Sequence, residues 1–440
     1  MTLHPMQQWL RSADPVLRSG RVRKILSTHI EADGPGVALG TLCEIETAAG
    51  AEVRAFQAEV VRVDRDSITL TPLEDRRPTF AGALVTACGH SNTIAAGEAF
   101  LGRVVDALGR PLDGAGDIRC SQLVPLHGGQ VSPLDRDSPQ DVLETGIRAI
   151  DGLLTLGRGQ RAGIFAASGV GKTSLMTQIA RQVQADVTIL CLVGERGREV
   201  EDIWNRGLDK EARSRSILVA ATSDQSASLR VRAGHYALAQ AEYWRARGKH
   251  VLLLLDSVTR LAMAMREIGL AAGEPPTVRA YTPSVFAAIP KMVERCGALK
   301  SGGAITAIMT VLSENDEIED PVCELMKSLL DGHVVLSRAL AEEGHFPAID
   351  VPRSISRQAE NLVRPPQRRL ALQVLEWLSK YDSSRTLVDT GLYVKGSNDL
   401  IDRAIERNPH IIKFLRQDRD HHSPVASTNA SLARLVEGKN

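Results

Sequence analysis

A run of small residues followed by lysine and threonine carries the clearest chemical signal in this sequence. It reads Ala166-Ala167-Ser168-Gly169-Val170-Gly171-Lys172-Thr173 and stands between an apolar segment and a helix-like segment. Small side chains let successive backbone N–H groups curl round an anion, and the following helix adds the positive end of its dipole. In such a loop Lys172 reaches the β- and γ-phosphates of a nucleotide, and the Thr173 hydroxyl ligates Mg²⁺. We therefore predict a phosphate-binding loop whose nucleotide-binding residues are Ser168, Gly169, Val170, Gly171, Lys172, Thr173 and Ser174.

Two acidic residues elsewhere in the chain could complete this site. They are needed as support, because Ala166 stands where the pattern usually has glycine and Gly-Lys-Thr alone also fits an ordinary turn. Asp256 ends a run of four leucines, and a carboxylate at the end of a strand can hold the hydration shell of Mg²⁺ while Thr173 binds the metal. Glu195 leaves another predicted strand, where it could polarise a water that attacks the γ-phosphate in line. The residue types leave Glu195 equally open to a place in a solvated charged run, the interpretation favoured for Glu199.

The charge balance and composition exclude some classes of protein. The chain has 440 residues, of which 43% are apolar and 24% charged, as is typical of soluble globular proteins with two or three domains. Lysine plus arginine and aspartate plus glutamate both total 53, whereas proteins that bind nucleic acid usually carry a basic excess for the phosphates. We therefore expect no nucleic-acid partner.

The cysteines and the N-terminus indicate a cytoplasmic location. None of the six cysteines lies in a Cys-x-x-Cys pair, so neither a zinc site nor a disulfide framework is indicated, and buried thiols in a reducing compartment are expected. His-Glu-x-x-His is absent, which removes support for a zinc hydrolase. The N-terminus lacks the apolar core of a signal peptide, and no apolar run approaches the roughly 20 residues that span a bilayer.

The elements that must position the candidate residues are those of an α/β fold. Short β-branched runs fill residues 25–95 and predict a small barrel. As far as about residue 340, almost continuous Val, Ile and Leu runs then alternate with helical stretches such as Leu229–Arg247, which indicates a mostly parallel, buried sheet. The predicted strands are Gly163–Ala166, Val187–Val193, Ile217–Ala221, Val251–Leu255, Ala304–Leu312 and His333–Leu336. The phosphate loop and Glu195 are expected at the same edge of this sheet, where parallel strands end.

Changes in composition divide the chain into five parts. These are an N-terminal arm (1–24), a small β-barrel (25–97), a phosphate-loop domain (98–365), a helical domain (366–416) and a polar, mobile tail (417–440). In the arm, Met6–Arg11 has a short helical pattern with Trp9 and Leu10 on its apolar side. A mobile arm and a helix that docks on a partner or a membrane surface are both open interpretations. In the helical domain, helices are predicted over Leu370–Tyr381, Leu400–Arg407 and Ile411–Leu415.

A further set of motifs follows in a fixed order between residues 194 and 357. They are Gly194-Glu195-Arg196-Gly197-Arg198-Glu199, Asp256-Ser257-Val258-Thr259-Arg260, Gly273-Glu274-Pro275-Pro276, Pro283-Ser284-Val285-Phe286, Leu330–Arg338, His345–Asp350 and Ser354–Arg357. With them the chain resembles, from about residue 22 to 415, the export ATPases of the flagellar and type III secretion systems, which are relatives of the catalytic subunit of rotary ATP synthase. The first and fourth of these motifs favour the export branch over the synthase branch.

This resemblance implies roles for individual residues in an ATPase. Lys172 and Thr173 match the phosphate and Mg²⁺ residues, Glu195 matches the catalytic carboxylate, and Asp256 matches the acid at a strand end. The implied cofactors are ATP and Mg²⁺. Arg357 matches an arginine that a neighbouring subunit supplies in trans, where a planar cation meets charge developing on the γ-phosphate.

The resemblance also implies an aromatic contact for the base of the nucleotide. Phe346 matches a residue, more often tyrosine, against which adenine packs. Phenylalanine keeps the stacking face and loses only the hydroxyl, so adenine binding is expected to survive. Ala166-Ala167 is the second departure, since synthase subunits have glycines there. Alanine is acceptable in the loop if its φ is negative.

The family implies a particular assembly and location. The fold would be a RecA-like phosphate-loop sheet with the N-terminal barrel and the C-terminal helical domain, in a cytoplasmic homohexamer with its sites between subunits. Ala280–Phe286 corresponds to a loop that lines the central channel, although it also fits a turn stiffened by proline. The implied partners are stalk and regulator proteins, the export gate and substrate–chaperone complexes, with peripheral association at the cytoplasmic side of the inner membrane.

Three other functions are considered. A catalytic subunit of a rotary ATP synthase or pump would require a second, noncatalytic type of chain. A hexameric nucleic-acid translocase would need a basic, aromatic N-terminal surface, whereas residues 25–95 contain Phe56 and Phe80 as their only aromatics. A scaffold that binds nucleotide without turnover is disfavoured by the intact set of Lys172, Glu195, Asp256 and Arg357.

Overall fold

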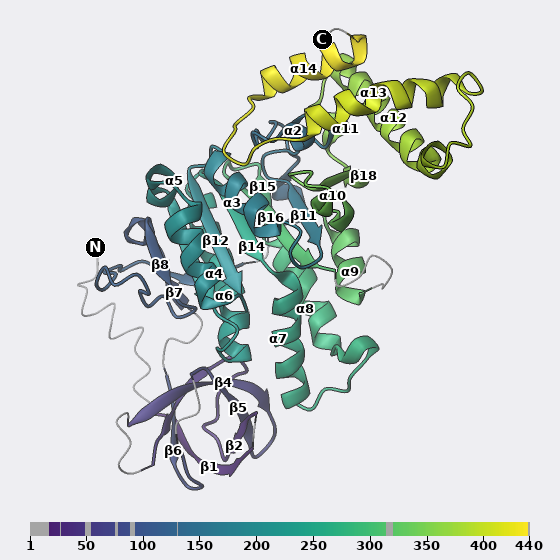
Figure 1. Cartoon of the computed structure of the whole chain (residues 1–440). Helices are drawn as coiled ribbons and strands as arrows, with labels where there is room; N and C mark the ends of the chain where they lie inside the picture. The colour runs from purple at the N-terminus through teal and green to yellow at the C-terminus, as the bar shows by residue number, and fades with distance from the viewer. Residues whose placement is uncertain are drawn as a thin grey trace.

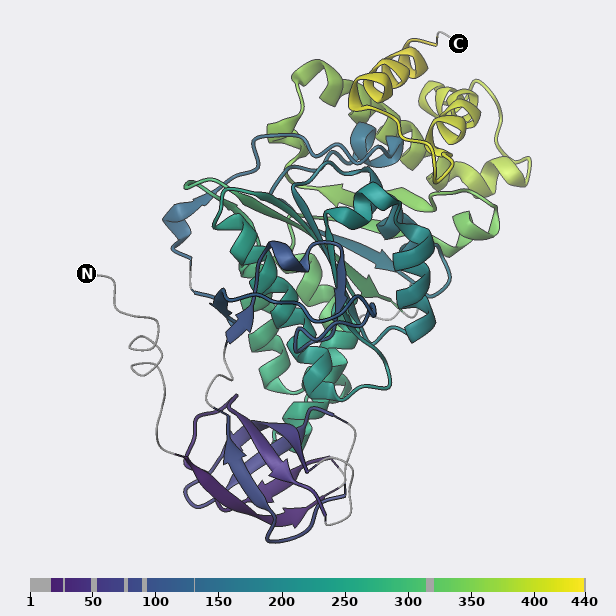
Figure 2. The same cartoon turned by 90° about the vertical axis from the view of Figure 1, so that its left-hand side faces the viewer.

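The computed structural model describes residues 17–26, 28–48, 54–74, 78–88, 93–129, 131–313 and 320–438. Three parts follow one another along the molecule: a small barrel, a large sheet between helices, and a group of C-terminal helices (Figure 1). The view from the side keeps this order, with the barrel and the C-terminal helices at opposite ends (Figure 2). The helical pattern predicted at Met6–Arg11 lies outside the described residues.

The N-terminal barrel is closed and antiparallel, with strand order β1-β2-β5-β4-β3-β6. Its strands are β1 (Ser19–Ile25), β2 (Ile30–Ala32), β3 (Leu42–Glu46), β4 (Ala55–Val63), β5 (Ile68–Pro72) and β6 (Leu84–Ala87). Alternate residues of β4, namely Phe56, Ala58 and Val60, are buried in the barrel, as the period of two in a strand requires. The predicted small barrel is confirmed.

The central sheet has ten strands, with the order β18-β17-β11-β16-β14-β12-β13-β8 along its main path. The strands are β8 (Arg103–Val105), β10 (Arg136–Asp137), β11 (Arg161–Ala166), β12 (Val187–Val193), β13 (Ser216–Ala221), β14 (His250–Asp256), β15 (Gly297–Leu299), β16 (Ala304–Leu312), β17 (Gly332–Leu336) and β18 (Ile349–Ser356). All six predicted strands are present, with ends shifted by two residues at most. A separate antiparallel pair, β7 (Thr93–Ala95) and β9 (Leu123–Pro125), flanks β8 in the chain.

Four strands of the central sheet, β8, β10, β15 and β18, were not predicted, and β18 is the longest of them. β18 pairs antiparallel with β17 at the edge of the sheet, and its sequence contains Pro352 and several polar residues. Proline cannot donate to a strand ladder and is therefore confined to positions such as a sheet edge. The sequence of β18 for this reason lacks the continuous apolar pattern by which the inner strands are recognised.

Helices cover both faces of the sheet. The α-helices of this domain are α2 (Arg148–Leu153), α3 (Lys172–Gln182), α4 (Gly197–Asp202), α5 (Lys210–Ser214), α6 (Ala227–Arg245), α7 (Val258–Ala271), α8 (Pro283–Glu294), α9 (Pro321–Leu329), α10 (Arg338–Glu342) and α11 (Ala359–Leu362), with short 3₁₀ or π turns η1 (Glu98–Phe100), η2 (Pro133–Asp135), η3 (Ile203–Gly207) and η4 (Val278–Ala280). In β12, Ile189 and Cys191 belong to a core shared with α6 and α7, whereas Leu190 and Leu192 belong to one shared with α2 and α3. This alternation explains why an inner strand is apolar throughout.

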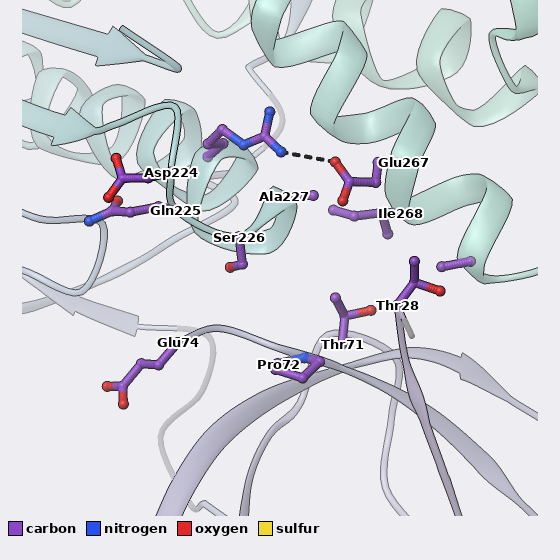
Figure 3. Close-up of a pocket in the computed structure, with 12 residues that line it drawn as sticks. Thr28, Thr71, Pro72, Glu74, Asp224, Gln225, Ser226, Ala227, Glu267 and Ile268 are labelled. Carbon is purple, nitrogen blue, oxygen red and sulfur yellow. Dashed lines mark hydrogen bonds and ion pairs between the residues drawn. The ribbon is translucent and has the colours of Figure 1, made fainter. Parts of the chain in front are cut away.

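The barrel meets the central domain at the first turn of α6 and the end of α7. Figure 3 shows Thr28 and Thr71 of the barrel facing Ser226 and Ile268 across a cavity of about 270 Å³. The Ser226 hydroxyl donates a 2.7 Å hydrogen bond to the carbonyl of Leu73, which follows β5. This contact ties the barrel to the N-terminus of α6.

The C-terminal part consists of α12 (Pro365–Asp389), α13 (Asp399–Leu415) and α14 (Val425–Glu437). The helices predicted over Leu400–Arg407 and Ile411–Leu415 are one helix, since α13 continues through Pro409. No helix of the described residues is both long and apolar enough to cross a membrane.

The expectation of a mobile tail over 417–440 is wrong for residues 425–437. They form α14, in which Thr428 and Leu432 are fully buried, and Leu432 belongs to the same core as Trp377 of α12. The polar residues 418–423 suggested disorder, but Val425, Leu432 and Leu435 recur on one helical face and carry the signal for a packed helix.

We predict that Leu432→Ala lowers the free energy of unfolding by about 2–5 kcal/mol, because it leaves a cavity beneath α14. The measurement is denaturant unfolding of the full chain. Leu392→Ala is the matched control, since Leu392 is 72% exposed and should change stability by no more than about 0.5 kcal/mol. Equal effects of the two substitutions would mean that α14 does not pack on the domain.

Candidate nucleotide site

The phosphate loop lies between β11 and α3, as predicted. Gly169 and Gly171 have φ of 82° and 94°, in the left-handed region that favours glycine. Among described residues, positive φ outside glycine occurs at Arg279 and Ala280 only, so the alanines at 166 and 167 meet the condition for replacing glycine. Helix α3 begins at Lys172 with no side-chain cap, which leaves its first backbone N–H groups for an anion.

The parallel strands bring the predicted charged residues together beside this loop. The Lys172 ammonium nitrogen lies 3.3 Å from Oε1 of Glu195 and also donates to Oδ1 of Asp256. These two carboxylate side chains are only 3% and 1% exposed. Because a buried carboxylate is stable only when it is paired, one lysine compensates two acids here.

Three residues that the sequence analysis did not assign to the site also hold these acids. The Thr310 hydroxyl donates a 2.6 Å hydrogen bond to Oδ1 of Asp256. Arg260 lies 3.3 Å from Oε2 of Glu195 and donates to the Gly194 carbonyl. The Ser223 N–H donates to the carbonyl of Glu195 at 3.0 Å. Thr310 reaches the site because β16 lies between β11 and β14, an order that its sequence does not reveal.

Burial shapes the acid–base behaviour of Glu195. Removal from water raises the pKa of Glu195, and the positive charges of Lys172 and Arg260 oppose that rise. A carboxylate with a raised pKa binds a proton more readily and is a better general base.

A cavity of about 1080 Å³ opens beside these residues. Its lining includes the predicted nucleotide-binding residues Ser168, Gly169, Gly171, Lys172, Thr173 and Ser174, together with Glu195. Val170 instead is 2% exposed and packs in the core, so only its backbone could serve a nucleotide. The volume is ample for a nucleoside triphosphate.

Two further residues were assigned to the site by resemblance, one aromatic and one basic. Both lie apart from the cluster of Lys172 and its two acids. Phe346 is 49% exposed, and a Cβ built on Gly171 would lie 3.8 Å from its ring, so this ring borders the phosphate loop. Arg357 follows β18 and does not line the cavity; its guanidinium donates to the carbonyl of Lys327 at 3.2 Å.

The segment predicted as a channel loop, residues 280–286, is mostly not a loop. Tyr281 and Thr282 are buried, and α8 begins at Pro283. The exposed part precedes it, where Val278 is 67% exposed. Arg279 and Ala280 adopt φ of 52° and 58° there, and Arg279 forms a 3.1 Å ion pair with Asp320.

A glycine-rich loop at the carboxyl end of a parallel strand, with a lysine and two acids from neighbouring strands, is the site of a phosphate-loop nucleoside triphosphatase. Residues 146–356 match the nucleotide-binding domain of the ATP synthase alpha/beta family, and residues 363–434 match the T3SS EscN ATPase C-terminal domain. The second match shows that the likeness continues past residue 416, where the sequence analysis ended it.

Individual relatives agree over nearly the whole chain. The flagellum-specific ATP synthase of Bacillus subtilis is 43% identical over 427 residues, 97% of each chain. The type 3 secretion system ATPase of Xanthomonas euvesicatoria is 43% identical over 96% of this chain and 94% of that protein. The structure of the assembled ATPase EscN from enteropathogenic E. coli matches with a TM-score of 0.89 and 39% identity, over 95% of this chain and 100% of that one. The chain therefore belongs to the family of flagellar and type III secretion ATPases.

Membership of this family decides between the functions that the sequence left open. The expected export-system ATPase is confirmed in preference to a rotary synthase subunit or a nucleic-acid translocase. ATP is the nucleotide of this family, and the predicted RecA-like fold with a barrel and C-terminal helices is confirmed as well.

We predict that Gly194→Ala destabilises the protein by more than about 1 kcal/mol. Gly194 has φ of 70°, and an added Cβ would lie 3.0 Å from the Arg260 side chain that contacts Glu195. Thermal and denaturant unfolding test this. Gly197→Ala is the control, because nothing lies within 4 Å of its added Cβ and its φ is not positive, so it should preserve or raise stability. Equal losses from both variants would contradict the strained geometry at Gly194.

Proposed function

We propose that this chain hydrolyses ATP to ADP and phosphate at the interfaces of a homohexamer and so energises protein export through a flagellar or type III secretion apparatus. The observation that carries the proposal is the pairing of Lys172 with two buried acids directly beside the phosphate loop. Lys172 would exchange these contacts for the β- and γ-phosphates, which leaves Glu195 and Asp256 free to act on water and metal.

The residues beside the loop fit Mg²⁺. Thr173 offers a hydroxyl at the cavity and Asp256 a carboxylate behind it, and oxygen donors of this kind suit a hard cation. Thr173 would hold the ion directly and Asp256 its hydration shell. When bound, Mg²⁺ would neutralise negative charge on the phosphates.

Glu195 would act as the general base. It would accept a hydrogen bond from the attacking water and polarise that water toward the γ-phosphate. Two features support this role: its burial raises its pKa, and its backbone is held by Ser223 while Arg260 holds its side chain. A base held in this way needs little reorganisation during the reaction.

Phe346 would pack against the adenine. Its half-exposed ring borders Gly171, and a flat apolar face at the end of a phosphate loop suits a purine.

Arg357 would serve the site of the neighbouring subunit. Its side chain is absent from the lining of its own chain's cavity, and the related EscN has been solved as an assembled ATPase. A guanidinium supplied across an interface would stabilise charge on the γ-phosphate and make hydrolysis depend on assembly.

The same relationship suggests partners and a location. EscN has been solved in complex with its central stalk EscO, so we propose a stalk protein as a partner of this chain, with regulator proteins, the export gate and substrate–chaperone complexes beyond it. The chain would act in the cytoplasm, peripherally at the inner membrane.

We predict that Glu195→Gln retains ATP binding and loses most turnover, on the order of 100-fold or more, because the amide cannot accept the proton. Steady-state hydrolysis and binding of a fluorescent ATP analogue measure the two effects. Glu201→Gln, an exposed neighbour on α4, is the control and should keep normal turnover. Normal turnover in Glu195→Gln would rule out the role of Glu195 as the base.

We predict that Arg357→Ala protein is inactive alone and regains partial activity when mixed with Glu195→Gln protein. A mixed interface can join an intact base from one subunit to an intact arginine from the next. Hydrolysis measured across mixing ratios tests this, with Arg353→Ala, an exposed change on the strand that precedes Arg357, as the active control. If no ratio restores activity, Arg357 does not act in trans.

A further inference from the structure

The 416–423 segment, which makes up most of the connection between α13 and α14, runs from the helical domain back to the phosphate-loop domain (Figure 1). There it is bound to the C-terminal end of α3, the helix that begins in the phosphate loop. Arg181 donates to the carbonyl of Arg419 at 2.6 Å and forms a 2.9 Å ion pair with Asp420. Gln182 donates to the carbonyl of His421 at 3.2 Å.

Gln417 is the centre of this segment. Its side chain is buried, and its oxygen accepts a 3.0 Å hydrogen bond from the backbone N–H of Arg148. Its amide nitrogen donates to the carbonyls of Gly146 and His421, both at 2.7 Å. Both the oxygen and the nitrogen of the Gln417 side-chain amide are therefore hydrogen-bonded. These bonds hold the segment against the turn before α2.

The backbone of Gln417 contacts the side of the site where Phe346 lies. The N–H of Gln417 donates to the carbonyl of Phe346 at 2.9 Å. Arg416 donates to the carbonyl of Glu343 at 3.4 Å, so the turn that carries Phe346 is bound at two points. Because the Phe346 ring is half-exposed, side-chain packing does little to fix it, and its position depends on its backbone.

We propose that Gln417 is a positioning residue for Phe346, and that the 416–423 segment thereby sets the affinity of the site for the base of the nucleotide. This rests on the proposed packing of adenine against Phe346. An aromatic ring held in place before binding loses less freedom when the base arrives, and this preorganisation strengthens binding. The base takes no part in bond breaking. Stronger binding of the base therefore lowers KM and leaves kcat unchanged.

The test is Gln417→Ala in the full-length protein. Loss of a buried hydrogen-bonding group should weaken binding of fluorescent ADP about tenfold and raise KM for ATP similarly, with kcat at saturating ATP within about twofold. Inhibition by tripolyphosphate should be unchanged, because this ligand has no base and contacts the phosphate loop alone. A general loss of structure would instead weaken the binding of both ADP and tripolyphosphate.

Two further variants calibrate the result. Gln367→Ala loses a glutamine side-chain hydrogen bond within the helical domain, to Asn429, and should leave both affinities unchanged. Gln417→Met keeps the length of the side chain but loses all of its hydrogen bonds, so its ADP affinity should fall as in Gln417→Ala, and this variant replaces Gln417→Ala if that protein does not fold.

Phe346→Ala distinguishes failure of this proposal from failure of the proposed packing of adenine against Phe346, on which it rests. If Phe346→Ala leaves ADP affinity intact, the base does not pack on Phe346 and both proposals fall. If Phe346→Ala weakens ADP binding but neither Gln417 variant does, the role of Gln417 is overturned and the base site stands. Equal weakening of ADP and tripolyphosphate by the Gln417 variants would also overturn it.

Discussion

The site depends on one cation between two buried acids. Glu195 and Asp256 are almost inaccessible to water, and each would be costly to ionise at that position without a partner. Lys172 contacts both, so the end of the phosphate loop is tied to the ends of two other strands. A ligand that takes Lys172 away from these acids must offer it comparable negative charge, and the phosphates of a nucleotide provide it.

The order of the strands makes this pairing available. β16 lies between β11, which leads into the phosphate loop, and β14, which ends in Asp256. Thr310 of β16 therefore reaches Asp256 from the strand that separates loop and acid. Glu195 follows β12, on the far side of β14, and Lys172 spans this distance with its long side chain. A parallel sheet gathers its strand ends at one edge, which brings together residues more than eighty positions apart.

The other two domains are attached to this sheet in different ways. The barrel is joined through the first turn of α6, by the contact of Ser226 with Leu73. The helical domain is joined through its 416–423 segment, which contacts the C-terminal end of α3 and the carbonyl of Phe346. The helical domain is therefore bound both to the phosphate-loop helix and to the backbone of Phe346, whose ring borders the loop.

The sequence by itself determined the parts of this protein that depend on local pattern. The phosphate loop, the inner strands of the sheet, α6 and the barrel follow from small residues at fixed spacing and from runs of apolar residues. Resemblance supplied Arg357 and Phe346, whose local sequence has no chemical signature. Only the tertiary structure decided that Lys172 bridges two acids, that Thr310 holds one of them, and where α14 packs. These contacts join segments distant in the chain, and they depend on strand order and helix docking, which the periodicity of a single segment does not encode.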